Sequence, residues 1–259
     1  MSKYTPKYKR LVLKISGEGL AGEEGFGIGA DPLSRVAAEI ADVHAAGCEV
    51  GVVVGGGNIL RGGAFSEKAR IPEATAHYMG MLATVLNALA LQETLEANGL
   101  QTRVMSSLPI ASVCEPFIRR RCMRHLEKGR VVVLAAGTGR PFVTTDTAAA
   151  LAAVETQADA LFKATQVDGV YSADPNTDPK AKRYNSLSYD QVINERLKVM
   201  DISAVDLCQR NNVPIIVFDL HRPGNMKRII AGEAIGTVVS CFTVSFRGSV
   251  RPAGAPFSR

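Results

Sequence analysis

The sequence predicts an α/β fold with a mainly parallel sheet, and two patterns support this prediction. Short apolar runs alternate along the chain with segments of helical periodicity, as in strand–helix–strand crossovers. One run contains Val50, Val52, Val53 and Val54 and is apolar on both faces, as expected of a central strand that helices cover on either side. The glycines at 55–57 would then let backbone N–H groups approach an anion, or adopt positive φ, although an ordinary glycine turn is the alternative.

Composition places the chain among globular proteins. Its 259 residues, 46% of them hydrophobic, suffice for one large α/β domain or two small ones. No apolar run approaches the roughly 20 residues of a membrane helix, and Lys14 interrupts the first short run, so we expect neither a membrane span nor a signal peptide, and a cytoplasmic location. The five cysteines form no CxxC pair and the four histidines no HExxH motif, which argues against a disulfide framework or a zinc site.

The net charge of +5 is unevenly distributed. Arg247, Arg251 and Arg259 lie in residues 241–259, a stretch with no acidic residue that follows the last recognisable strand. We therefore expect one domain at 1–240 and a basic, flexible tail at 241–259. A second basic cluster comprises Arg119, Arg120, Arg121, Arg124, Lys128 and Arg130. It lacks interleaved aromatics and a nucleic-acid motif, so a solvated helix face is favoured over a nucleic-acid site.

The first predicted strand covers residues 9–16, because apolar side chains alternate on its faces. Lys14 lies near its carboxyl end and is followed at once by Ser16 and Gly17. Ligands of open α/β sheets gather beyond this end of the strands, which places Lys14 to meet a phosphate. A solvent-facing lysine is the alternative.

A loop and a helix are expected to follow. Residues 22–27 are too rich in glycine for a helix or a strand, and their one aromatic, Phe26, could anchor the loop. Asp31 then resembles an N-cap with Pro32 in the first helical position, and apolar residues repeat at helical spacing up to Gly47.

A second helix is expected to start at residues 58–61, where its N-terminus and Arg61 would extend the anion site. Residues 77–98 form a long helical pattern, apolar over so broad an arc that one face could meet another subunit, although core packing explains most of it. Gly99 ends this helix, and residues 100–105 return as a third strand.

The fourth strand is predicted at residues 130–135 and leads into residues 137–146, which have no apolar periodicity. Such a stretch after a buried strand favours a ligand-binding loop. Thr145 or Asp146 can cap the next helix, at 147–155, and that structural role is the alternative for either residue.

The last third of the chain continues the same alternation. Residues 159–163 form a fifth strand, and turn signals follow at Asp168 and Asp174. The remaining expected elements are a helical region at 188–212, a strand at 214–218, a helix from about Pro223 and a final strand near 237–240.

Six sequence motifs indicate which chemistry the protein performs. Lys14, Arg61 and Lys163 beside a glycine turn suggest phosphoryl transfer or nucleotide binding, while GxxxxGK[ST] and the protein-kinase signatures are absent. The motifs are KISGE at 14–18, GEEGFG at 22–27, GGGNILRG at 55–62, MGMLATVLN at 79–87, GTGRPFVTTD at 137–146 and KATQVDGVYSADP at 163–175. Together, over about residues 9–240, they closely resemble the bacterial uridylate kinases of the amino-acid kinase family.

This resemblance implies a three-layer α/β/α sandwich with a mainly parallel central sheet, assembled as a homohexamer. The implied activity is transfer of the γ-phosphoryl group of ATP to UMP with Mg²⁺, which gives UDP and ADP in pyrimidine nucleotide biosynthesis. GTP would activate the enzyme and UTP would inhibit it. The Mg²⁺ would be bound mainly through nucleotide phosphates, and the N-terminal half of the domain would serve UMP and the C-terminal half ATP.

The resemblance also implies roles for individual residues. Catalytic roles fall on Lys14, Arg61, Asp146, Lys163 and Asp201, of which Asp146 and Asp201 would organise Lys14 and the metal. ATP binding falls on Lys14, Ile15, Ser16, Gly17, Gly57, Arg61, Thr165, Tyr171 and Asp174, with Tyr171 near the adenine. UMP binding falls on Gly56, His77, Thr138, Gly139, Arg140, Pro141, Phe142, Val143, Thr144 and Thr145. The response to GTP falls on Gly22, Glu23, Glu24, Gly25, Phe26 and Gly27.

One position departs from the family pattern. The family commonly has Asp, in contact with the UMP ribose, where this chain has His77. A histidine can still hydrogen-bond a hydroxyl, but as a single donor or acceptor rather than as a fixed anion.

The acceptor constrains the implied mechanism. The second pKa of a phosphate monoester is about 6, so UMP is mostly a dianion at neutral pH and needs no general base. Catalysis would then rest on positioning and on charge neutralisation by Lys14, Arg61, Lys163 and Mg²⁺.

Two other functions remain open at this point. A kinase of the same family that phosphorylates a carboxylate, such as that of aspartate or acetylglutamate, would share the glycine turn and Lys14 but not the loop at 137–146 as written. A non-catalytic nucleotide sensor is the second alternative. Loss of Lys14 or Asp201 would favour it, and both are present.

Overall fold

The protein is analysed as a computed structural model that describes residues 5–22, 24–173, 175, 177–178 and 180–241. Glu23, Asp174 and residues 242–259, for which the sequence made predictions, lie outside the described residues.

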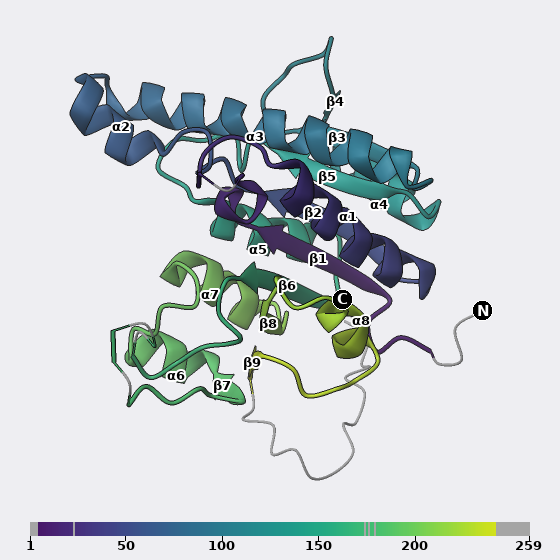
Figure 1. Cartoon of the computed structure of the whole chain (residues 1–259), viewed down its shortest axis with the longest axis vertical. Helices are drawn as coiled ribbons and strands as arrows, with labels where there is room; N and C mark the ends of the chain where they lie inside the picture. Colours follow the sequence, from purple (N-terminus) through teal and green to yellow (C-terminus); the bar gives the residue numbers. More distant parts are fainter. Residues whose placement is uncertain (1–4, 23, 174, 176, 179, 242–259) are drawn as a thin grey trace, which may run out of the picture.

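Within the described chain, nine strands form one sheet in the order β4-β3-β5-β2-β1-β6-β8-β9-β7, which Figure 1 shows from top to bottom. The strands are β1 (Arg10–Ile15), β2 (Glu49–Val54), β3 (Thr102–Ser106), β4 (Glu115–Pro116), β5 (Val131–Ala135), β6 (Ala160–Thr165), β7 (Ser186–Ser188), β8 (Ile215–Asp219) and β9 (Thr237–Ser240). The strands from β4 to β8 in this order are parallel, whereas β9 runs antiparallel to β8. The predicted mainly parallel sheet, with β2 in its interior, is confirmed.

Helices cover both faces of the sheet and complete the three layers implied by the sequence (Figure 1). They are the 3-10 helix η1 (Gly17–Leu20) and the α-helices α1 (Ala30–Ala45), α2 (Gly62–Ala69), α3 (Glu73–Ala97), α4 (Arg119–Glu127), α5 (Thr145–Glu155), α6 (Tyr189–Asn194), α7 (Ile202–Arg210) and α8 (Asn225–Ile230). Helix α1 contacts both α3 and α8, and these three helices cover one face of the sheet. Helices α4, α5, α6 and α7 pack on the opposite face.

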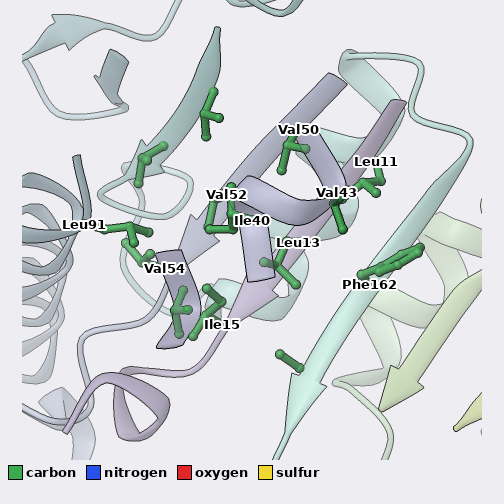
Figure 2. Close-up of a cluster of buried hydrophobic side chains, with 14 of the residues drawn as sticks. Leu11, Leu13, Ile15, Ile40, Val43, Val50, Val52, Val54, Leu91 and Phe162 are labelled. Atoms are coloured by element: carbon green, nitrogen blue, oxygen red, sulfur yellow. The ribbon is translucent and has the colours of Figure 1, made fainter. Parts of the chain in front are cut away.

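The alternation of side chains along β1 and β2 divides the core into two halves. Figure 2 shows Leu11, Leu13 and Ile15 beside Val50, Val52 and Val54, with Ile40 and Val43 of α1 and Leu91 of α3 packed on them. The intervening residues Val12 and Val53 belong to the opposite half, with the alanines of α5. Because side chains alternate with a period of two, Lys14 lies on the α5 side with Val12. The core pattern therefore decides which face carries the lysine.

Two predicted helix starts are wrong. Helix α1 begins at Ala30 with Gly29 as its N-cap, so Asp31 lies inside the first turn. The reason is close packing, because a Cβ on Gly29 would lie 2.8 Å from Cα of Gly22. No helix starts at residues 58–61. The N–H groups of Ile59 and Leu60 both donate to the carbonyl of Gly56, which closes a turn before α2 begins.

Other predicted boundaries differ by less. Helix α3 starts at Glu73, four residues before the predicted start, and the helical region at 188–212 is two helices, α6 and α7, with Arg196 at φ +49° between them. Strands β4 and β7 were not predicted, because two or three residues are too few to show a periodic pattern.

Helix α3 is long and apolar enough, by length and composition alone, to cross a membrane. In the structure it packs on α1, α2 and the strands β3 and β5, and it contributes Met81, Val85, Leu91 and Leu95 to the core. Core packing therefore explains much of its apolar character, as the sequence suggested.

Two glycines with positive φ, Gly236 and Gly47, differ in how closely other backbone packs on them. Gly236 has φ +76°, and a Cβ there would lie 2.0 Å from the carbonyl oxygen of Val217 on β8. Gly47 has φ +97°, but a Cβ there would meet nothing within 4 Å. We predict that Gly47→Ala lowers the free energy of unfolding by about 1–2 kcal/mol, the cost of the left-handed conformation. Gly236→Ala should cost clearly more, as measured by urea denaturation, and equal losses would contradict the packing explanation.

Candidate active site

Two lysines lie side by side at the carboxyl ends of neighbouring strands. Lys14 of β1 and Lys163 of β6 are direct partners in the parallel register. Strands in a sheet are about 4.8 Å apart, and the two side chains extend from the same face of the sheet. Lys14 is only 7% exposed. The sequence predicted both lysines as site residues, and the fold brings them together.

Asp146, at the start of α5, bridges the two lysines. Its Oδ1 lies 2.8 Å from Nζ of Lys14, and its Oδ2 accepts a hydrogen bond of 2.9 Å from Nζ of Lys163. Burial raises the pKa of Asp146, but Lys163 and Lys14 outweigh this effect and hold the pKa below its usual value. Burial lowers the pKa of Lys163 more than Asp146 raises it. Lys163 also donates to the carbonyl of Val199.

Asp146 is free for this role because another residue caps α5. The prediction that Thr145 or Asp146 forms the cap is wrong: Thr144 is the N-cap, and its hydroxyl accepts from the N–H groups of Asp146 and Thr147 at 3.1 and 3.3 Å. A capping hydroxyl satisfies backbone donors that would otherwise compete for the carboxylate. Asp146 thus keeps both oxygens for the lysines.

Asp201 holds the start of α5 rather than Lys14. It is the N-cap of α7 and accepts from the N–H group of Ala204 at 2.8 Å. Thr147 donates to both of its oxygens at 2.9 and 3.1 Å, and Thr144 also donates to Oδ2. Among the described residues, the carboxylate that pairs with Lys14 is therefore Asp146. Sequence reasoning missed Thr147, because a threonine in the first turn of a helix carries no distinctive pattern.

The glycine turn brings β2 onto β1 through backbone contact. A Cβ on Gly55 would lie 2.7 Å from the nitrogen of Gly17, and one on Gly56 would lie 2.7 Å from the carbonyl oxygen of Gly80 on α3. None of the three glycines at 55–57 has positive φ, so close approach, and not left-handed backbone, explains them. The N–H groups of Gly17, Gly56 and Gly57 donate to no acceptor within the described chain. They remain available to an anion.

An amide pair that the sequence did not reveal holds this turn. Asn58, which is 1% exposed, and the fully buried Asn87 of α3 exchange hydrogen bonds of 3.0 and 2.7 Å. Asn87 also donates to the carbonyl of Gly55 at 2.7 Å. A polar amide at a core position of an otherwise apolar helix is the signal that could have predicted this contact.

Arg61 stands beside Gly57, since a Cβ on that glycine would lie 3.7 Å from the Arg61 side chain. It is exposed and forms an ion pair with Glu18 of η1, a partner that the sequence did not predict. Ile15 and Ser16 connect β1 to η1 and complete this side of the turn.

A cavity of about 210 Å³ lies between the glycine turn, α3 and the loop at 137–145. Six of the residues predicted for UMP line it, namely Gly56, His77, Thr138, Arg140, Val143 and Thr145. Gly57, which was predicted for ATP, lines it as well. Gly139, Pro141, Phe142 and Thr144 belong to the same loop without lining the cavity. The wall is completed by residues that were not predicted as site residues, namely Leu60, Gly80, Met81, Thr84 and Gly137.

A second cavity of about 320 Å³ lies beyond β6, where Tyr171 meets the segment Glu195, Arg196, Leu197 and Lys198. The hydroxyl of Tyr171 donates to Asp168 at 2.6 Å, and Arg183 donates to the same carboxylate at 2.9 Å. Thr165 ends β6 and donates to the carbonyl of Val167 at 2.6 Å. The sequence singled out Tyr171 but not residues 195–198, which lie in the break between α6 and α7.

The loop at 22–27 docks on the glycine turn. Gly27 donates to the carbonyl of Asn58 at 2.9 Å, and the Asn58 side chain donates to the carbonyl of Gly27 at 2.7 Å. Phe26 is 69% exposed, so the expectation that it anchors the loop is wrong. Gly22, Glu24 and Gly25 form the remainder of the described loop.

The lysine pair has one carboxylate beside it that is available to Mg²⁺. In the described part of the chain, no three histidine, cysteine or acidic side chains form a metal-binding group. Oδ1 of Asp146 is buried and accepts no aligned hydrogen bond, although Lys14 lies 2.8 Å away. One such carboxylate suits an ion that is bound mainly through nucleotide phosphates, as Mg²⁺ usually is in kinases.

Comparisons with known proteins show the family of this chain. The profile of the amino acid kinase family matches residues 9–219. A UMP kinase from Bacillus anthracis is 39% identical, with a TM-score of 0.88 over 92% of this chain and 99% of that chain. A UMP kinase from Ureaplasma parvum is 32% identical, with a TM-score of 0.85 over 90% and 99%. A uridylate kinase from Archaeoglobus fulgidus is 31% identical, with a TM-score of 0.68 over 89% and 99%.

Asp146→Asn should lower the free energy of unfolding at pH 7 by about 3–5 kcal/mol, because two buried ammonium groups lose their carboxylate. The matched control is Asp206→Asn, which removes an exposed i,i+4 ion pair with Arg210 and should cost less than about 1 kcal/mol.

The contribution of Asp146 to stability should also depend on pH. Its pKa is lowered in the folded state, so the contribution is fully present above the unfolded pKa of about 4 and is lost as the pH falls through the folded pKa. Urea midpoints at pH 7 and pH 3 test both points. Equal losses for the two variants would refute the bridging role.

Proposed function

Since the chain belongs to the amino acid kinase family, we propose that this kinase transfers the γ-phosphoryl group of ATP to UMP and releases UDP and ADP. One observation carries the proposal: the lysine pair bridged by Asp146 lies at the same end of the sheet as the cavity lined by the glycine turn and the loop at 137–145. The likeness to UMP kinases at 31–39% identity supports UMP as the acceptor.

In this proposal the site brings two anionic phosphates together. The unpaired N–H groups of Gly17 and Gly57 and the ammonium groups of Lys14 and Lys163 offset the charge of the transferring phosphoryl group. Arg61 extends this positive region from the side of Gly57, and Asp146 keeps both lysines aimed at it. UMP is mostly a dianion at neutral pH, so no residue has to act as a general base.

Nucleotides would occupy the two cavities on either side of the lysine pair. We assign UMP to the cavity of about 210 Å³, on the N-terminal half of a domain at 1–240. We assign the adenosine of ATP to the cavity of about 320 Å³, on the C-terminal half, where the Tyr171 ring offers a surface for stacking. Asp174, predicted for ATP, lies outside the described residues.

Mg²⁺ is proposed as the metal partner of ATP. When bound, it would neutralise charge on the transferring phosphoryl group, with Asp146 and Asp201 orienting the cations around it. The same proposal places the enzyme in the cytoplasm, in the synthesis of pyrimidine nucleotides.

The acceptor is tested by measuring ADP release with UMP, CMP, aspartate or acetylglutamate, each with ATP and Mg²⁺. We expect turnover with UMP well above that with the others. Lys14→Ala is the control, and it should reduce turnover by about 10²–10³ with the fold intact by circular dichroism. A preference for a carboxylate acceptor would replace UMP in the proposal, and full activity of folded Lys14→Ala would remove Lys14 from the catalytic group.

We also propose that GTP activates and UTP inhibits the enzyme, and that the loop at 22–27 takes part in the GTP response. The contacts of Gly27 with Asn58 support this, because any shift of the loop would reach the glycine turn through one residue. Initial rates with GTP or UTP added at fixed ATP and UMP test the regulation. Unchanged rates with both would remove it.

A homohexamer is proposed as the working assembly. Helix α3 supports self-association, because Tyr78, Leu82 and Leu86 follow one another at a spacing of four residues and are 41–53% exposed. A row of large apolar side chains on one helix face suits burial against another copy. The described core does not use this row, since it lies on the side of α3 away from the sheet.

Leu82→Asp should reduce the oligomer to smaller species, because it places a charge in the apolar row of α3. Light scattering coupled to size-exclusion chromatography measures the mass. Ile202→Asp is the control, since Ile202 is 58% exposed on α7 and lies outside the row. An unchanged mass for Leu82→Asp would show that α3 is not the contact.

A further inference from the structure

The loop at 137–145 contains a residue in an unfavourable conformation. Phe142 has φ +65°, in the left-handed region that residues with a Cβ rarely adopt. Its side chain is 67% exposed, so burial does not fix it. Some other contact must therefore hold the backbone in this state.

His77 of α3 supplies that contact. Its Nδ1 accepts a hydrogen bond of 3.0 Å from the Phe142 N–H group, and the two rings meet edge to face with centroids 5.0 Å apart. The start of the loop is held by Ser107, which donates to the carbonyl of Gly137 at 2.8 Å, and its end by Thr144 and Asp201. Between these two points lie residues 140–143. Among the described residues, the hydrogen bond that reaches this stretch from outside the loop is the one from Phe142 to His77.

The His77 ring is itself fixed. Because a backbone N–H group can only donate, Nδ1 is the acceptor and the ring proton of the neutral form lies on Nε2. Nε2 faces Glu73, whose Oε1 is 3.7 Å away. A Cβ on Gly62 would lie 3.1 Å from Cδ2 of His77, so the start of α2 packs directly against the ring edge.

We propose that His77 is a positioning residue for nucleotide binding: it holds Phe142 in the left-handed conformation and thereby sets the wall formed by Arg140 and Val143 in the cavity of about 210 Å³. This differs from the role that the sequence suggested, a direct contact with the ribose, because Nδ1 already accepts from Phe142 and the remaining donor, Nε2, faces Glu73. The inference rests on the proposal that UMP occupies this cavity.

The test compares two substitutions of His77 in the full chain. His77→Leu removes the acceptor with little change in size. His77→Asn keeps an acceptor oxygen close to the position of Nδ1. We expect His77→Leu to raise KM for UMP about tenfold, the effect of one lost hydrogen bond, while kcat and KM for ATP stay within about twofold. His77→Asn should restore KM to within about threefold of the wild type, and thermal melts confirm that both variants fold.

A deoxy ligand separates positioning from direct contact. Dissociation constants for UMP and 2′-deoxy-UMP are measured by calorimetry with both variants. Positioning predicts that His77→Leu weakens both ligands equally. Loss of affinity for UMP alone would assign His77 to the ribose and overturn the inference.

A double-mutant cycle gives a third measurement. Glycine adopts positive φ without steric cost, so the loop of Phe142→Gly should depend less on His77. Adding His77→Leu to Phe142→Gly should therefore raise KM for UMP by much less than about tenfold. Additive effects would overturn the inference. The activity of the wild type with UMP is measured before any variant is made. If the wild type does not phosphorylate UMP, the proposed function is wrong, whatever the role of His77.

Discussion

The candidate site depends on one buried carboxylate between two buried ammonium groups. Lys14 and Lys163 stand in register on adjacent parallel strands, where like charges would repel each other and lose hydration. Asp146 makes this arrangement possible, because each of its oxygens faces one lysine. The same contact links the sheet to α5, and through Thr144 and Asp201 it links α5 to α7. A site that concentrates positive charge is thus built into the packing of the sheet against α5 and α7.

The second constraint is the close approach of backbones at the glycine turn. A side chain at Gly55 would collide with the backbone of Gly17, and one at Gly56 with the backbone of α3. Gly55 therefore allows the turn to lie close to the end of β1, and Gly56 allows it to lie close to α3. The buried pair of Asn58 and Asn87 then fixes the turn with hydrogen bonds on a rigid helix. Unpaired N–H groups held this firmly can meet an anion without rearrangement, which is the basis of electrostatic preorganisation.

The cavity of about 210 Å³ is assembled differently, from a loop that carries strain. Gly137, Gly139 and Phe142 all have positive φ, and only the first two are glycines. Contacts from three separate elements hold the loop: Ser107 after β3, His77 of α3 and Asp201 of α7. A strained loop that needs outside support gives the protein a wall whose shape depends on side chains far away in the sequence.

The sequence alone determined the alternation of strands and helices, the mainly parallel sheet and the residue types at the candidate site, because hydrophobic periodicity and contiguous motifs are local properties. It also predicted Lys14, Asp146 and Lys163, but not that one carboxylate joins both lysines. That contact and the support of Phe142 by His77 depend on which segments the fold brings together. They were decided only by the tertiary structure, because distance along the chain says nothing about contacts between residues 17 to 132 positions apart.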